Sequence, residues 1–384
     1  MLHFVPDEFQ TRKEALMAGM AERKLDAILL FAQESMYWLT GYDTFGFCFF
    51  QCLALKADGE MRLLTRSADL RQARATSNIE TVVVWRHRLN ADPAMDLRDM
   101  LDDMELLGAR IGVEWATHGL TAANGRAVEQ RLGSFATLID ASDLVPLLRM
   151  IKSPAEIAYM REAADLADRA FEATLPLVRP GVNEAAILHA LQGTILAEGG
   201  DYPANPFVVG SGPYALLSRY TSGRRTLEAQ DQLTLEWAGV KAQYHVPSMR
   251  TIIIGKPTQR HEELYAATRE ALTAAEEVLR PDHTFGEVFD VHAAVLEAHD
   301  LARHRLSTAG YAVGARFAPT WMDRPMFVTG STRPILPNMT VFVHMVIMDS
   351  DSGTAMSIGR TYLTTTTDPE PLSRLPLDLM VVEG

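Results

Sequence analysis

The segment Leu233–Ile254 has the sequence LTLEWAGVKAQYHVPSMRTIII, which is rich in apolar and β-branched residues. A second segment of this kind, Thr340–Leu363, has the sequence TVFVHMVIMDSDSGTAMSIGRTYL. Residues of these types are favoured in strands, so both segments are predicted to be strand-rich. A pair of predicted helices precedes each of them. This duplication predicts a pseudo-symmetric α+β domain, in which two half-sheets form one curved sheet covered by helices.

The four helices are predicted from residues that start and stop helices. Ser153 precedes Pro-Ala-Glu, a combination that is favoured in the first turn of a helix. Arg-Pro dipeptides at 179–180 and 280–281 terminate the first helix of each pair, and Asn183 and Thr284 are suited to cap the second. The predicted helices are 154–177, 184–197, 261–280 and 285–302.

Strands and helices alternate in the first part of the chain. The predicted strands are Ala27–Phe31, Cys52–Leu55, Met61–Thr65, Thr81–Trp85 and Ile111–Glu114, and the predicted helices are 8–23, 95–107 and 120–132. Asp58-Gly59 is suited to a tight hairpin between the second and third strands. The pattern predicts an α/β domain with a mixed sheet over residues 1–147, followed by the α+β domain over 148–384.

Composition narrows the possible classes of protein. The chain has 384 residues, of which 47% are hydrophobic and 22% charged, and these values are typical of globular proteins. Its net charge of −13 argues against nucleic acid as a partner. The two cysteines, Cys48 and Cys52, indicate a reducing compartment, and we find no signal peptide or apolar membrane-spanning segment. We therefore expect a cytoplasmic protein that binds neither nucleic acid nor membranes.

Several segments, taken in order, resemble the pita-bread family of aminopeptidase P, prolidase, creatinase and ectoine hydrolase. They are Arg149–Arg161 (RMIKSPAEIAYMR), Leu235–Gly239 with Tyr244 and Met249–Thr251, Gly310–Gly314 (GYAVG), and Pro337–Met339 with the strand that follows. The last two resemble the family's Gly-His-Gly-Ile-Gly loop and its Pro-Gly-Met sequence. The resemblance implies a small α/β N-terminal domain of the creatinase/prolidase type and a C-terminal pita-bread domain with a pseudo-twofold curved antiparallel sheet.

The resemblance also implies where metal ligands would lie. In the family's metallopeptidases, two aspartates, one histidine and two glutamates hold two divalent ions. The matching positions in this chain are Glu236, Pro247, Tyr311, His344, and Gly359 or Arg360. Proline and glycine offer no side-chain ligand, whereas paired divalent ions require several anionic oxygens. The resemblance thus implies the metal-free branch, with creatinase and ectoine hydrolase, and no metal ion or other cofactor.

Three residues are candidates for acid–base catalysis. Glu236 lies in an otherwise apolar strand, where a carboxylate needs a cavity or a partner, unless it is only at the sheet edge. His344 lies in the most apolar strand of the chain and is either a proton shuttle or a core histidine bonded to the backbone. His245 is a plausible hairpin neighbour of Glu236, or a surface or interface histidine.

Four further residues are candidates for substrate binding. Arg250 contacts the substrate or forms a buried ion pair that supports the sheet, and Tyr311 donates a hydrogen bond or only fills the cavity. Arg219 stands near a position where creatinase uses a histidine, and an arginine there would suit a substrate carboxylate. Trp321 either forms a wall of the pocket or belongs to the core.

The leading hypothesis is a metal-independent hydrolase that cleaves a C–N bond in a small carboxylate-bearing nitrogen compound of the ectoine, creatine or guanidino class. One alternative is a metallopeptidase similar to Xaa-Pro dipeptidases, with a degenerate metal site. Another is a catalytically inactive protein that binds a small molecule. The resemblance also implies a homodimer, in which the N-terminal domain of one subunit covers the cavity of the other.

Overall fold

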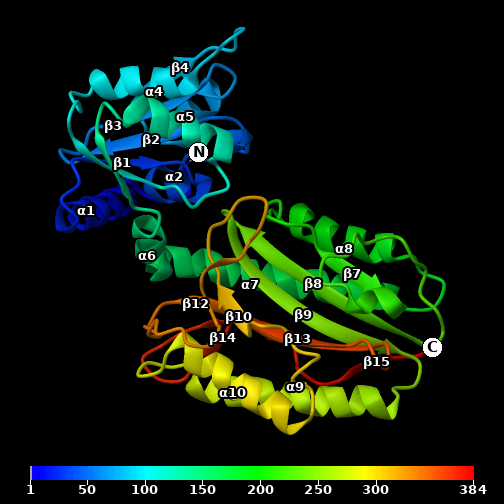
Figure 1. Ribbon diagram of the computed structural model, residues 1–384. Coiled ribbons are helices and arrows are strands. Elements are labelled where there is room, and N and C mark those ends of the chain that lie inside the picture. Colours follow the sequence, from blue (N-terminus) through cyan, green and yellow to red (C-terminus); the bar gives the residue numbers. More distant parts are fainter. Residues whose placement is uncertain (1) are drawn as a thin grey trace. The chain divides into compact units, whose positions relative to one another are not determined.

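The computed structural model describes residues 2–384, and it divides the chain after Arg149 into two compact units (Figure 1). The first unit is an α/β domain and the second is an α+β domain, in agreement with the prediction. Within residues 2–384, no helix is both long and apolar enough to cross a membrane.

The first unit is built on a mixed six-stranded sheet. Its order is β4-β3-β2-β1-β5-β6, and β1 pairs in parallel with β5 but antiparallel with β2. The predicted hairpin at Asp58-Gly59 is present between β2 and β3, and Gly59 has a φ of 93°. The elements are α1 (Pro6–Glu22), β1 (Ala27–Leu30), α2 (Gln33–Thr40), β2 (Cys52–Lys56), β3 (Met61–Arg66), α3 (Leu70–Thr76), β4 (Thr81–Trp85), α4 (Pro93–Asp102), β5 (Arg110–Val113), α5 (Ala122–Leu132), β6 (Thr137–Asp140) and α6 (Leu144–Met150).

The second unit contains a nine-stranded sheet and two helix pairs (Figure 1). The strand order is β11-β10-β12-β13-β9-β8-β7, with β14 paired to β13 and β15 to β9. The elements are α7 (Pro154–Thr174), α8 (Glu184–Ala197), β7 (Val208–Ser211), the short 3-10 helix η3 (Gly212–Leu216), β8 (Asp231–Lys241), β9 (Tyr244–Ile254), α9 (Gln259–Val278), α10 (Phe285–Ala298), β10 (Gly310–Ala312), β11 (Asp323–Met326), β12 (Thr340–Asp349), β13 (Thr354–Leu363), β14 (Glu370–Pro371) and β15 (Met380–Val382).

The predicted duplication is present in the order of these elements. The first helix pair, α7 and α8, precedes the antiparallel hairpin β8–β9, and the second pair, α9 and α10, precedes the hairpin β12–β13. The two hairpins join through β9 and β13, so the two halves form one continuous sheet. Helix α10 ends at Ala298 and not near 302 as predicted, because Asp300 adopts a left-handed conformation with a φ of 59°.

Side-chain hydrogen bonds fix where the helices begin. Ser153 and Thr284 each accept a hydrogen bond from the backbone N–H three residues later, and the glutamate at that third position bonds back to the cap. These are capping boxes, which satisfy N–H groups that have no partner within the helix. Asn183 caps α8 through Ala185 N. These three start signals therefore predicted the starts of α7, α8 and α10 correctly, whereas α9 begins at Gln259 after the cap Thr258 and not at 261 as predicted.

Helices α7 and α9 cover one face of the sheet, and that face is closely packed. The indole N–H of Trp237 on β8 donates to the carbonyl of Ala167 in α7 at 2.9 Å. Beside it, a Cβ atom at Gly239 would lie only 1.8 Å from the carbonyl oxygen of Ala163. Helix and strand backbones thus approach each other as closely as a glycine allows, which leaves the opposite face of the sheet to form the cavity.

We expect Gly239→Ala to lower the free energy of unfolding by about 3 kcal/mol or more, because the added methyl group must displace the backbone of α7. Gly193→Ala, inside α8, is the control: its nearest neighbour would be a His189 ring atom at 3.8 Å, and it should stabilise the protein by up to about 1 kcal/mol. Urea unfolding of both variants tests this. Equal effects of the two substitutions would contradict the packing argument.

Candidate active site

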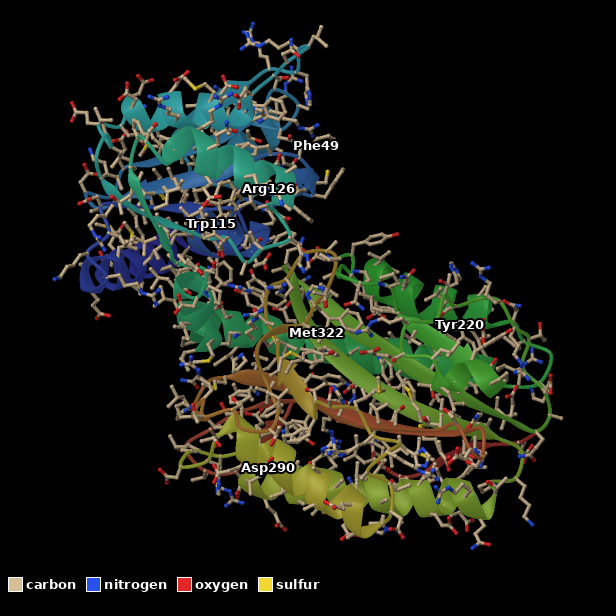
Figure 2. All side chains as sticks on the ribbon, in the orientation of Figure 1. Phe49, Trp115, Arg126, Tyr220, Asp290 and Met322 are labelled. Atoms are coloured by element: carbon tan, nitrogen blue, oxygen red, sulfur yellow. The ribbon has the colours of Figure 1, made fainter. Side chains whose placement is uncertain are left out.

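A cavity of about 630 Å³ lies on the face of the sheet opposite α7 and α9. Strands β7, β8, β9 and β12 contribute residues to its floor, and helix α8 together with loops around residues 205–207, 218–222, 306–308 and 319–322 forms its walls. Tyr220 and Met322, which are labelled in Figure 2, belong to two of these loops. The predicted site residues Glu236, His344, Tyr311, Arg219 and Trp321 all line this cavity.

The strand register places the floor residues in one row across the sheet. Val208 pairs with Glu236, Glu236 with Met249, Met249 with Gly359, and Gly359 with His344. Paired residues on neighbouring strands point to the same face. The only two polar side chains of this row are therefore carried by different hairpins, one by each half of the duplicated domain.

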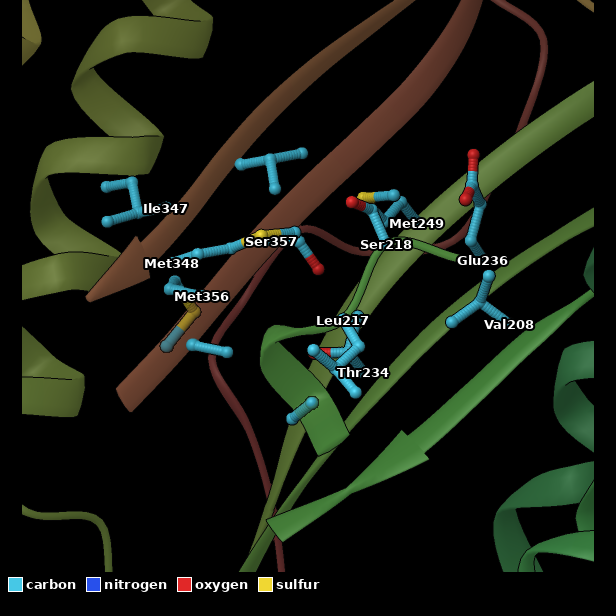
Figure 3. A pocket seen from close by; sticks show the side chains of 13 residues that line it. Val208, Leu217, Ser218, Thr234, Glu236, Met249, Ile347, Met348, Met356 and Ser357 are labelled. Atoms are coloured by element: carbon cyan, nitrogen blue, oxygen red, sulfur yellow. The ribbon is translucent and has the colours of Figure 1, made fainter. Parts of the chain in front are cut away.

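Glu236 is a buried carboxylate with apolar neighbours. Its side chain lies near Val208 and Met249 (Figure 3), and the residue is only 6% exposed. The structure of residues 2–384 gives its carboxylate no hydrogen bond or ion pair. Burial raises its pKa from the ordinary 4.5 to about 7, against a smaller opposing effect of the positive charge on Arg219. Near neutral pH this group exists in both protonation states.

His344 is buried on the same face, and the structure makes it a neutral imidazole. Burial, followed by the nearby His292, lowers its pKa to about 3. Its Nδ1 atom has no hydrogen-bond partner within residues 2–384. A neutral imidazole keeps one donor and one acceptor nitrogen, so His344 can orient a water molecule or substrate without carrying charge.

Tyr311 and Trp321 form a hydrogen-bonded pair in the cavity wall. The indole N–H of Trp321 donates to the Tyr311 hydroxyl at 2.9 Å, which leaves the Tyr311 O–H free to donate. Burial, together with the nearby Glu236, raises the pKa of Tyr311 well above its ordinary value. The hydroxyl thus remains protonated, and the ring centre lies 5.8 Å from that of His344.

Arg219 brings a positive charge to the cavity from the loop after η3. Its guanidinium donates to the carbonyl of Ser218 at 2.9 Å and contacts the sulfur of Met322 at 4.0 Å. Within residues 2–384 it forms no ion pair with a carboxylate. The residue is exposed, so its charge is open to a ligand that enters the cavity.

Glu184, at the start of α8, holds this loop in place. One oxygen of its buried carboxylate accepts from the backbone N–H and hydroxyl of Ser211, at 2.8 and 2.7 Å. The other accepts from the Tyr220 hydroxyl at 3.0 Å and from the backbone N–H groups of Gly223–Arg225 at 3.1–3.2 Å. Sequence reasoning missed Glu184, because an acidic residue in a first helical turn is common and nothing local indicates these distant partners.

His245 and Arg250, which were also predicted in the site, do not line the cavity. The ring of His245 accepts from Ala204 N–H at 2.9 Å and bonds to the carbonyl of Gln243 at 2.8 Å, so both nitrogens have backbone partners. Arg250 neighbours Met249 on β9 and therefore points to the helix-covered face. There it donates to the carbonyls of Met249 and Gly359. In the structure both side chains are thus bonded to backbone groups and lie outside the cavity lining.

Comparisons with known proteins agree with this architecture. Residues 158–366 match metallopeptidase family M24, and residues 12–151 match the creatinase/prolidase N-terminal domain. The chain belongs to family M24. It is 26% identical over 397 residues to the ectoine hydrolase of Halomonas elongata, with 99% of this chain and 98% of that protein covered.

Two further relatives extend the comparison. An uncharacterised hydrolase/peptidase of Sinorhizobium fredii is 27% identical over 392 residues, with 99% of both chains covered. The Xaa-Pro dipeptidase from Bacillus anthracis has the same fold, with a TM-score of 0.84, 21% identity, and 97% of this chain and 100% of that chain covered. The ectoine hydrolase and the family match together support a hydrolase of family M24.

The residues of this M24 chain do not fit the paired metal ions that the family implies. Of the five matching positions, only Glu236 and His344 carry a ligand group of the kind such ions require. At Gly359, a Cβ atom would lie 2.5 Å from the ring of Phe342, which fills the space that a glutamate side chain would enter. The one cluster of three candidate ligand groups within residues 2–384 is His304, Asp349 and Asp351, none of which lines the cavity.

We expect Glu236→Gln to stabilise the fold at about pH 8 and to have little effect at about pH 5. The folded-state pKa of Glu236 is raised, so its contribution to stability is present at low pH and is lost as the pH rises toward 7. The expected gain at the higher pH is on the order of 2–4 kcal/mol, measured by urea unfolding. The same gain at both pH values would contradict the raised pKa.

We expect Glu184→Gln to release the loop that carries Arg219 and Tyr220. In glutamine an NH₂ group replaces one carboxylate oxygen. This NH₂ group cannot accept from backbone N–H donors, so several hydrogen bonds are lost. Tryptic cleavage after Arg224 and Arg225 should become about tenfold faster or more. Glu198→Gln, at the other end of α8, is the control and should leave the cleavage rate unchanged. An unchanged rate in Glu184→Gln would show that the loop does not depend on this carboxylate.

Proposed function

We propose that this protein is a metal-independent hydrolase that cleaves a C–N bond in a small carboxylate-bearing nitrogen compound. The observation that carries the proposal is the unpaired carboxylate of Glu236 in the cavity floor, with a pKa of about 7. A general base is most effective when its pKa lies near the working pH. The likeness to an ectoine hydrolase and the loss of metal-ligand groups at three of the five positions support the same reading.

The proposed reaction uses Glu236 twice. Its carboxylate takes a proton from a water molecule, whose oxygen adds to the carbon of the scissile C–N bond. The Tyr311 hydroxyl, held by Trp321, donates a hydrogen bond to the oxygen or nitrogen on which negative charge develops. The protonated Glu236 then delivers its proton to the leaving nitrogen as the C–N bond breaks. Neutral His344 orients the water, and Arg219 binds the substrate carboxylate.

We propose a small molecule as its ligand, and a homodimer as its working form. A degenerate metallopeptidase and an inactive binding protein are the competing functions, and each predicts a different outcome in the experiment that follows. A metallopeptidase would lose activity on chelation, and an inactive protein would bind ligands without turnover.

We expect amine-releasing activity, in protein freed of metal by chelation, toward a panel of carboxylate-bearing amides, amidines and guanidines. Glu236→Gln should lower kcat at least about a hundredfold, because it removes the base. The activity of the wild-type protein should rise with pH through about 7, since Glu236 must lose its proton to act. The exposed Glu277→Gln is the control variant, with unchanged kcat. Activity that requires added manganese or zinc, or that survives in Glu236→Gln, would overturn the proposal.

A further inference from the structure

The cavity contains few charges, and this restricts what it can bind. Of the residues in 2–384 that line it, Arg219 and Glu236 are the only ones that carry charge near neutral pH, because the low pKa of His344 keeps that ring neutral. A cationic group on the substrate would therefore have only Glu236 as a partner. An ammonium or guanidinium group there would occupy the carboxylate and lower its pKa, which would remove the proposed base. The scissile part of the substrate is thus expected to be uncharged.

The floor around Glu236 and one wall of the cavity are apolar, whereas the loops at 218–222 and 306–308 contribute mainly polar side chains. Phe207 and Trp321 lie with ring centres 6.1 Å apart and form an aromatic wall. Val208, Met249 and Val346 form the floor, which continues along the sheet toward Leu217 and Met356 (Figure 3). Methionine side chains adapt to apolar groups of varied shape. This surface favours a substrate with a sizeable apolar substituent.

The size of the cavity supports the same conclusion. A volume of about 630 Å³ lies within the range of roughly 300–1,000 Å³ that is typical of pockets for drug-sized ligands. A compact metabolite with two opposite charges would leave much of the apolar surface uncovered and would place its cationic group on Glu236, the proposed base. A larger molecule with a single negative charge would fill the cavity, and its charge would pair with Arg219.

We infer that the substrate is an N-acylated amino acid with an apolar side chain or acyl group, a conclusion that rests on the proposed hydrolase function. Arg219 binds the carboxylate through two parallel hydrogen bonds, and the neutral amide lies over Glu236. Water adds its hydroxyl group to the acyl carbon, the amide C–N bond breaks, and the nitrogen takes the proton from Glu236. The products are a carboxylic acid and a free amino acid. A free dipeptide fits less well, because its ammonium group has no second carboxylate to bind.

Calorimetric titration of the wild-type protein and of Glu236→Gln tests this inference with defined probes. N-acetyl-L-phenylalanine should bind at least about tenfold more tightly than N-acetylglycine, ectoine, creatine or alanyl-proline. Arg219→Gln should weaken binding of N-acetyl-L-phenylalanine by about tenfold or more, but should not change binding of its uncharged carboxamide. Arg224→Gln is the matched control, because this neighbouring arginine does not line the cavity, and its affinity for both probes should remain that of the wild type.

The outcomes separate this inference from the proposed function. Tight binding of N-acetyl-L-phenylalanine with no turnover by the wild-type protein would support the ligand class and contradict the hydrolase. Turnover of ectoine or creatine, with no binding of the acylated amino acids at millimolar concentration, would support the hydrolase and overturn the ligand class. Equal loss of affinity for the acid and its carboxamide in Arg219→Gln would also overturn the ligand class, since the arginine would then not bind the carboxylate specifically.

Discussion

Side chains along β8, β9, β12 and β13 point alternately to the two faces of the sheet. This alternation determines which residues of the second unit pack against helices and which face the cavity. Because α7 and α9 pack against one face of these strands, every second residue must be apolar or small there, as at Trp237 and Gly239. The residues between them face the cavity and need not be apolar or small. Positions on the face that contacts α7, such as Gly239, thus maintain the fold, whereas positions on the opposite face determine the properties of the cavity.

The row Glu236–Met249–Gly359–His344 illustrates this separation. Its members pair across four strands and share the open face of the sheet. The chain belongs to a metallopeptidase family, yet this row and its neighbours carry one carboxylate and one imidazole as candidate ligands. Side chains in this row do not contact the helix-covered face, so the fold does not depend on which of them are acidic. The floor around Glu236 is apolar, and burial there raises the pKa of its carboxylate.

Much of this arrangement was predictable from the sequence. Both units, the helix caps at Ser153, Asn183 and Thr284, and the presence of Glu236 and His344 on strands of the same sheet follow from local patterns and from the family resemblance. These patterns involve residues close together in the chain, or motifs whose order is preserved.

The sequence could not predict the placements that depend on register and on distant contacts. Arg250 follows a family motif, but only the pairing of Glu236 with Met249 shows that its side chain points to the helices. His245 shares the face of Glu236, yet it lies four residues along β9 from Met249, roughly 13 Å away, and its ring is bonded to backbone. Glu184 binds groups that are 27 to 41 positions away in the chain. No local pattern indicates such partners.

The way in which Glu184 holds its loop has an evolutionary consequence. The carboxylate binds mainly backbone N–H groups, which every residue except proline supplies, so the anchoring does not depend on the side chains at 223–225. Position 219 is outside these bonds altogether. Its side chain can therefore be exchanged without loosening the loop, so the charge that descendants of this protein present at the cavity can change while Glu236 and His344 stay in place.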